Sequence, residues 1–192
     1  MGQRLGGKNQ KVCQKIIVEL KSQKMSEILI RDISIFAIQG KESLIKSVSK
    51  SITIEEAEKC FIGALSEIKK ERPNIDIYYV IGAVTSDGQE FIERNLELLK
   101  ERTKEANRKL PKAIVFSAGD IFNKKLFKRF DSHGAVNQDY LDLWEKVLNS
   151  GFIDCIIRTP DWGRSVGATH ENKVAHQKSL RVYDYFALMD RM

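Results

Sequence analysis

The sequence IDIYYVIGA at residues 75–83 decides the fold class. It is apolar almost throughout, which is typical of a parallel strand with both faces covered. Three further runs also indicate strands: KAIVF at 112–116, FIDCIIR at 152–158 and LRVYDY at 180–185. Because stretches with helical spacing of apolar residues separate these runs, strand and helix alternate along the chain. This alternation predicts an α/β fold with a doubly wound parallel sheet.

Ligands of such sheets bind at the carboxyl ends of the strands. The loops to inspect are therefore residues 82–88, 117–120 and 159–171. In the second of these loops, Asp120 is positioned either to hold a ribose hydroxyl or to form a turn. The segment 123–137 is polar and mixed, and its pattern predicts neither helix nor strand.

The residues before this alternation predict a small accessory unit. Residues 28–38 (ILIRDISIFAI) are rich in β-branched and aromatic types and favour a strand. Serine and threonine alternate with other residues over 47–54, a period of two that favours a second strand. A T-x-x-E capping box beginning at Thr53 predicts a helix that ends near Pro73. We therefore expect a β-hairpin and a helix over residues 25–74.

The net charge of +6 is concentrated at the start of the 192-residue chain. Residues 1–24 hold six basic residues and one acidic residue, a net of +5, whereas the other 168 residues are almost neutral. We predict a flexible basic arm over residues 1–24, which is either solvated without a specific partner or in contact with nucleic acid. The α/β domain itself, residues 75–192, is not expected to carry a broad basic surface.

Composition excludes several classes of protein. No stretch approaches the ~18 uncharged apolar residues of a membrane span, so no membrane partner is expected. The start of the chain lacks the apolar segment of a secretory signal, and the three widely spaced cysteines fit a reducing compartment, which together predict a cytoplasmic protein. The three histidines match no zinc spacing, so we expect neither a metal nor a cofactor.

The loop after the third strand carries the most informative pattern. Ser165 stands where a helix N-cap is expected, and a helix start suits a phosphate or another anion. Gly167, Glu171 and Ala175 are spaced to share one helix face. An acidic residue this early in a helix either serves chemistry or stabilises the helix dipole. Trp162, just before, is either a packing anchor or a platform on which a base stacks.

Residues 165–175 (SVGATHENKVA) resemble the S-x-G-x-x-x-E-x-x-x-A signature of the nucleoside 2-deoxyribosyltransferase superfamily, which includes nucleoside 5'-monophosphate N-glycosidases. Residues 79–83 (YVIGA) are similar to the Y-L-A-G-P strand end of that superfamily. The resemblance covers residues 75–186 and leaves residues 1–74 outside. It implies a flavodoxin-like fold and a homo-oligomer that acts on a small nucleotide or nucleoside.

The resemblance also implies roles for individual residues. Glu171 would be the nucleophile that attacks C1' and displaces the base, before water or a second base resolves the ester. Tyr79 would orient this carboxylate, and Asp142 would assist departure of the base, with Asp139 as a competitor for that role. Ser165 would bind the 5'-phosphate.

The predicted substrate-binding set is Gly82, Ser165, Gly167, Trp162 and Asp120. The chain is thus expected to be an N-glycosidase or N-(deoxy)ribosyltransferase, with a non-catalytic nucleotide-binding or sensing module on the same fold as the alternative.

Overall fold

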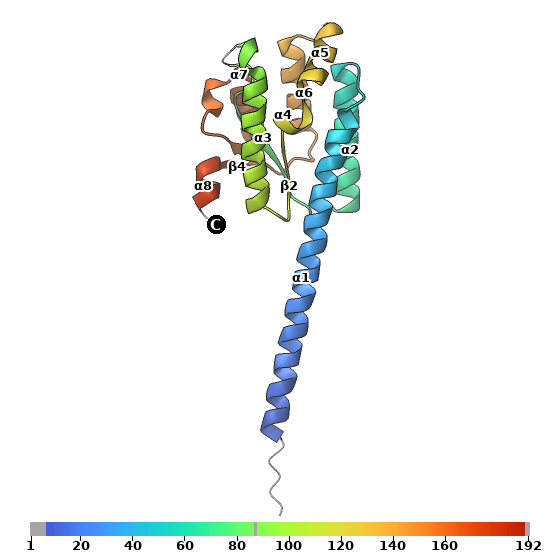
Figure 1. Ribbon diagram of the computed structural model, residues 1–192, viewed down its shortest axis with the longest axis vertical. Helices are drawn as coiled ribbons and strands as arrows, with labels where there is room; N and C mark the ends of the chain where they lie inside the picture. The colour runs from blue at the N-terminus through green and yellow to red at the C-terminus, as the bar shows by residue number, and fades with distance from the viewer. Residues whose placement is uncertain (1–6, 87, 191–192) are drawn as a thin grey trace, which may run out of the picture.

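The computed structural model describes residues 7–86 and 88–190. Its centre is a four-stranded sheet with the order β2-β1-β3-β4, in which every neighbouring pair is parallel (Figure 1). The strands are β1 (Ile77–Ile81), β2 (Ile114–Ser117), β3 (Cys155–Arg158) and β4 (Arg181–Asp184). Three of them lie within the segments expected from the sequence, β2 extends one residue past its segment to Ser117, and the prediction of an α/β parallel sheet is confirmed.

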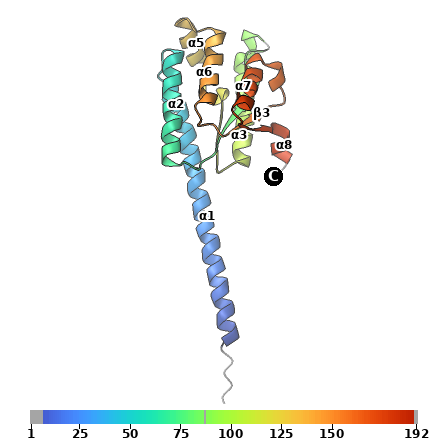
Figure 2. The same ribbon diagram turned by 180° about the vertical axis from the view of Figure 1, so that it is seen from behind.

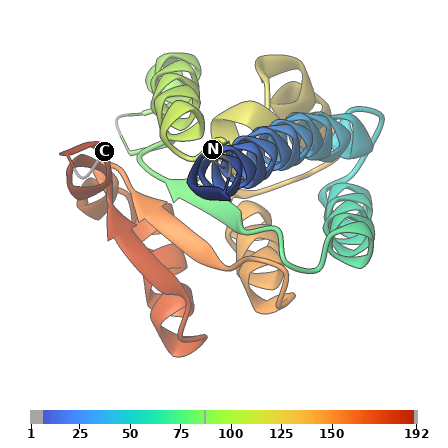
Figure 3. The same ribbon diagram turned by 90° about the horizontal axis from the view of Figure 1, so that it is seen from below.

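Helices cover both faces of this sheet. Figure 3 shows α3 on one face, with α6 and α7 on the other. The elements between and after the strands are η1 (Gln89–Phe91), α3 (Ile92–Lys109), α4 (Ala118–Ile121), α5 (Lys124–Ser132), α6 (Asn137–Asn149), η2 (Trp162–Arg164), α7 (Val166–Gln177) and α8 (Tyr185–Asp190). The segment that the sequence left unassigned therefore holds α5. Asn123 starts that helix, since its side chain accepts a hydrogen bond from the Leu126 N–H at 3.0 Å.

The capping box at Thr53 is confirmed as the start of α2 (Ile54–Glu71). The Glu56 N–H donates to Thr53 Oγ1 at 3.3 Å, and the Glu56 carboxylate accepts from the Ile52 N–H at 2.8 Å. These bonds satisfy N–H groups that the first helical turn leaves without partners. The buried face of α2 recurs every three or four residues and consists of Ile54, Ala57, Phe61, Leu65 and Ile68.

The predicted β-hairpin in residues 25–74 is wrong. Residues 28–38 and most of 47–54 belong to one helix, α1 (Gly7–Val48), or to the turn after it. The serines that suggested a period of two hydrogen-bond within the helix: Ser47 Oγ donates to the Leu44 carbonyl at 2.7 Å. Such bonds let serine lie inside a helix without an external partner.

A helical pattern in α1 competes with the strand-like composition. Ala37, Gly40, Leu44 and Val48 recur at spacings of three and four and are buried. Gly40 allows a close approach to the sheet, because a Cβ at this position would lie 2.5 Å from Ile114 Cδ1 on β2. The segment forms a helix because burial of this face outweighs the β-propensity of the isoleucines around it.

The first part of α1 extends well beyond the rest of the molecule (Figures 1 and 2). With 42 residues, α1 is about 63 Å long. The expected flexible arm over residues 1–24 is helical from Gly7 onward, and residues 1–6 lie outside the described part of the chain. Over the described residues, no helix combines the length and apolar character that a membrane crossing needs.

The second part of α1 and all of α2 belong to the same hydrophobic core as the sheet. Two polar links strengthen this attachment. Lys41 Nζ lies 2.9 Å from the carboxylate of Asp120 on α4, and both side chains are largely buried. The guanidinium of Arg129 on α5 donates to the carbonyls of Ser49 and Ser51 at 3.1 and 2.9 Å. The residues before the strand–helix alternation therefore build part of the α/β body.

Candidate functional site

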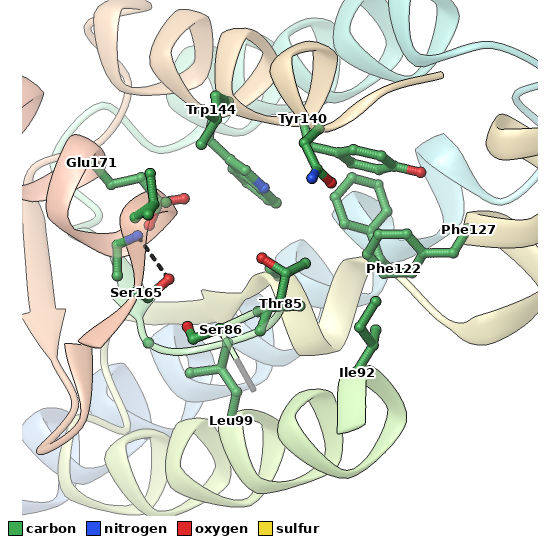
Figure 4. Close-up of a pocket in the computed structure, with 18 of the residues that line it drawn as sticks. Thr85, Ser86, Ile92, Leu99, Phe122, Phe127, Tyr140, Trp144, Ser165 and Glu171 are labelled. Carbon is green, nitrogen blue, oxygen red and sulfur yellow. Dashed lines mark hydrogen bonds between the residues drawn. The ribbon is translucent and has the colours of Figure 1, made fainter. Parts of the chain in front are cut away.

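A pocket of about 460 Å³ opens at the carboxyl ends of β1 and β3 (Figure 4). At this point the strand order reverses, because the chain leaves β1 toward β2 on one side while β3 lies on the other. Loops diverge at such a switch point and leave a crevice for a ligand. The loop after β1, α3, the α4–α6 segment and the start of α7 all contribute to its walls.

A buried Tyr–Glu pair forms one end of this pocket. Tyr79 Oη donates to Glu171 Oε1 at 2.9 Å, which joins the middle strand to the second turn of α7. The two residues are only 1% and 6% exposed. Tyr79 is fixed further by the indole of Trp144, whose ring is stacked on it at a centroid distance of 4.7 Å. The spacing that placed Glu171 on the inner face of its helix is thus realised as a contact with the sheet.

Burial controls the protonation of both members of the pair. Loss of solvent raises the pKa of Glu171 to about 8, although the hydrogen bond from Tyr79 acts in the opposite direction. Burial, followed by the neighbouring carboxylate, raises the pKa of Tyr79 well above 10. Tyr79 therefore remains a neutral donor, and Glu171 changes charge near neutral pH.

The start of α7 lies beside this pair. Ser165 is the N-cap, and its Oγ accepts from the Ala168 N–H at 3.3 Å, as the dashed line in Figure 4 marks. The hydroxyl proton of Ser165 remains able to donate. Ser165 and Gly167 both line the pocket, so the positive end of a 12-residue helix faces it.

Gly82 sets the distance between the loops after β1 and β3. A Cβ at Gly82 would lie 2.6 Å from Thr159 Oγ1 and 3.0 Å from Leu99 Cδ1, so this position has no room for a side chain. The Thr159 hydroxyl in turn donates to the Ile81 carbonyl at 3.0 Å. Gly82 lines the pocket through its backbone and allows β1 and β3 to end side by side.

An aromatic wall forms the other end of the pocket, and sequence reasoning missed it. Figure 4 shows Phe122, Phe127 and Tyr140 grouped there, with Trp144 between them and Glu171. The rings touch: the Phe127–Tyr140 centroids are 5.0 Å apart and the Phe122–Trp144 centroids 5.6 Å. The spacing of Tyr140 and Trp144, four residues apart on one helix, was a signal of this shared face.

Asp131 is a second pocket residue that the sequence did not suggest. It is the single acidic residue of α5 and lines the exposed rim of the aromatic end. Its carboxylate accepts a hydrogen bond from Tyr140 Oη at 3.1 Å. Asp131 lies in the segment for which the sequence predicted no element, so nothing placed it near the strand ends.

Four of the predicted site residues do not line the pocket. Asp142 accepts from the Gln138 amide at 2.6 Å on the exposed side of α6, and Asp139 caps that helix by accepting from the Val136 N–H at 2.8 Å. Asp120 caps α4 and pairs with Lys41, whereas Trp162 packs against the core with the Arg158 guanidinium 5.0 Å from its ring centre. The structure thus brings together Glu171, Tyr79, Gly82, Ser165 and Gly167.

Comparisons of the chain with protein-family models, with curated proteins and with solved structures gave no match. Within residues 7–86 and 88–190, no three His, Cys, Asp or Glu side chains converge as metal ligands would. The geometry itself defines a class: an α/β protein with a ligand-sized pocket at its strand ends, acidic and buried at one end and aromatic at the other.

Proposed function

We propose that this protein cleaves or transfers the N-glycosidic bond of a nucleotide or nucleoside, with Glu171 as the nucleophile. The observation that carries the proposal is the buried Glu171 carboxyl, held by Tyr79 at 2.9 Å inside a pocket at the strand ends. The strand order β2-β1-β3-β4 is compatible with the flavodoxin-like fold. The resemblance of residues 165–175 to the deoxyribosyltransferase signature points to the same chemistry.

The reaction would proceed in two displacements. The Glu171 carboxylate attacks C1', and the C1'–N bond breaks with its electron pair on the departing base, which takes a proton from solvent. Water or a second base then attacks C1' of the ribosyl ester and releases the carboxylate. This division lowers the barrier because a carboxylate stabilises the oxocarbenium-like transition state on both steps. Tyr79 holds the attacking oxygen in position.

The start of α7 suits the 5'-phosphate of a nucleotide. Free N–H groups and the positive end of the helix dipole favour an anion there, and the Ser165 hydroxyl adds a donor. The anion site and the carboxyl belong to the same helix, six residues apart. This arrangement favours a nucleoside monophosphate over a free nucleoside.

Release of base from a panel of nucleosides and 5'-monophosphates, followed by chromatography, tests the proposal. We expect release by the wild type and a loss of at least about a thousandfold in Glu171→Gln. Glu97→Gln is the matched control, because Glu97 is an exposed glutamate on α3. Inactivity of the wild type on every substrate, or full activity of Glu171→Gln, would contradict the proposal.

One observation favours a second candidate, a nucleotide-binding module without turnover. With a pKa of about 8, the Glu171 carboxyl is mostly protonated at pH 7, and a neutral carboxyl binds a ligand without attacking it. Calorimetric titration with the same panel separates the two functions. Tight binding that survives Glu171→Gln, together with no base release by the wild type at any pH up to 9, would establish the binding module.

A further inference from the structure

The two ends of the pocket differ in chemistry, and the proposed reaction uses only one of them. Glu171 and Ser165 lie at the acidic end, whereas Phe122, Phe127 and Tyr140 lie at the other (Figure 4). A substrate whose C1' is at Glu171 therefore extends its base toward the aromatic end. The aromatic side chains and the rim residue Asp131 determine which base this end can bind.

The aromatic wall provides surfaces for a flat ring. Phe122 and Tyr140 meet edge to face at 6.0 Å, and Phe127 and Tyr140 lie tilted at 5.0 Å, so the rings hold one another in place. Trp144 continues this surface toward Glu171. Aromatic side chains bind bases by stacking, and every base has such a face. The wall alone would therefore bind a base without selecting which one.

Selection needs a polar group at the edge of the base, and Asp131 provides it. Among the described residues that line the pocket, Asp131 and Glu171 are the two carboxylates. The Tyr140 hydroxyl donates to Asp131 Oδ1 at 3.1 Å, which orients the carboxylate and leaves Oδ2 to accept from a ligand. An ionised carboxylate can only accept hydrogen bonds. It attracts an N–H edge and repels a carbonyl edge.

We propose, on the basis of the proposed glycosidic activity, that Asp131 selects bases that carry an exocyclic amino group. The amino group of adenine or cytosine donates to Asp131 Oδ2 while the ring stacks on the aromatic wall. Hypoxanthine and uracil place a carbonyl oxygen at the corresponding ring position and meet the carboxylate with a second acceptor. Tyr140 has two roles in this arrangement: its ring is part of the aromatic wall, and its hydroxyl positions the Asp131 carboxylate.

The test uses two pairs of 5'-monophosphates that differ in the amino or oxo substituent: those of adenine and hypoxanthine, and those of cytosine and uracil. A hydrogen bond to a charged, partly exposed group predicts about a tenfold preference in kcat/KM for the amino member. Asp131→Asn should reduce the preference to about onefold or invert it, because an amide also donates to a carbonyl. Tyr140→Phe should reduce it in part. Asp32→Asn, an exposed aspartate on α1, is the matched control.

Two outcomes overturn this inference and leave the proposed function intact. One is base release by the wild type without preference within either pair. The other is a preference that Asp131→Asn does not change. If no substrate is turned over, the proposed activity fails separately, and the dissociation constants of the same pairs for wild type and Asp131→Asn decide the inference. Equal affinities, or a difference that Asp131→Asn preserves, would then overturn it.

Discussion

The free energy of unfolding of Glu171→Gln, measured relative to that of the wild type, should increase from acid to alkaline pH. The pKa of Glu171 is about 8 in the folded protein, against an ordinary value of 4.5. The folded state therefore binds this proton more tightly than the unfolded state. Below pH 4.5 Glu171 is protonated in both states and does not affect the free energy of unfolding. That free energy falls as the pH rises from 4.5 to 8, and above pH 8 the loss is constant.

The size of the effect follows from these two pKa values. Each pKa unit between the folded and unfolded chain is worth about 1.4 kcal/mol, so the full deficit approaches 5 kcal/mol, of which about 1 kcal/mol is already present at pH 5. Between pH 5 and pH 9 the wild type should lose about 4 kcal/mol relative to Glu171→Gln. The glutamine amide nitrogen adds a constant burial cost, which cancels when the two pH values are compared.

Urea unfolding of both proteins at pH 5, 7 and 9 measures this difference, with Glu97→Gln as an exposed control. Tyr79 does not interfere, because its pKa lies well above 10. A difference between wild type and Glu171→Gln that stays constant within about 1 kcal/mol from pH 5 to pH 9 would refute the reasoning. So would a wild type that gains stability relative to the variant as the pH rises.

Three other predictions follow from the same structure. Tyr79→Phe removes the hydrogen bond that lowers the pKa of Glu171, so the midpoint of the kcat/KM–pH profile should rise above 8, and an unchanged midpoint would contradict this role. Gly82→Ala has no room for its methyl group and should lower the free energy of unfolding in urea by about 1–3 kcal/mol, whereas an unchanged value would show that the loops yield. Deletion of residues 1–24 should preserve cooperative unfolding by circular dichroism, and deletion of residues 1–50, which removes part of the core, should abolish it.

The sheet was predictable because three of its four strands, β1, β2 and β3, are buried along almost their whole length. β1 (Ile77–Ile81) and β2 are buried at every position, and β3 is buried at all but its last position. The carboxyl ends of such strands mark the ligand edge, and the spacing of Gly167, Glu171 and Ala175 marked the inner face of α7. Tyr79 was predicted from the family resemblance. Ser165 was predictable for a local reason, since an N-cap depends on its own helix.

The helix α1 was not predictable from its composition. Isoleucines and serines over residues 28–54 favour a strand locally, but the partner surface on α2 and β2 selects the helical face. Local propensity contributes tenths of a kcal/mol per residue, whereas burial of one large apolar side chain contributes about 1.5–3 kcal/mol. Tertiary packing therefore determines the structure of this segment.

Asp142 and Asp131, two of the three aspartates of α5 and α6, show a different limit of the sequence. Asp142 matched a dipeptide of the family pattern, yet α6 turns it outward, while Tyr140 and Trp144 face the pocket. Asp131 matched nothing and reaches the rim because α5 folds back over the strand ends. The rotation of α6 and the path of the chain through α5 determine where these two aspartates lie. A short sequence motif does not specify either of these features.

The burial of Glu171 has a cost that also explains how it would act. At pH 7 the burial of Glu171 lowers the folding stability by about 3 kcal/mol relative to acid pH, because the folded protein keeps a proton that the unfolded chain releases; this is a large share of the 5–15 kcal/mol that holds a domain folded. The same loss of solvent leaves the carboxylate poorly neutralised until positive charge develops beside it. An oxocarbenium-like C1' supplies that charge only at the transition state, so the carboxylate stabilises the transition state more than the bound substrate. A solvated glutamate at this position would stabilise the substrate and the transition state to nearly the same extent. It would therefore accelerate the reaction less than a buried glutamate does.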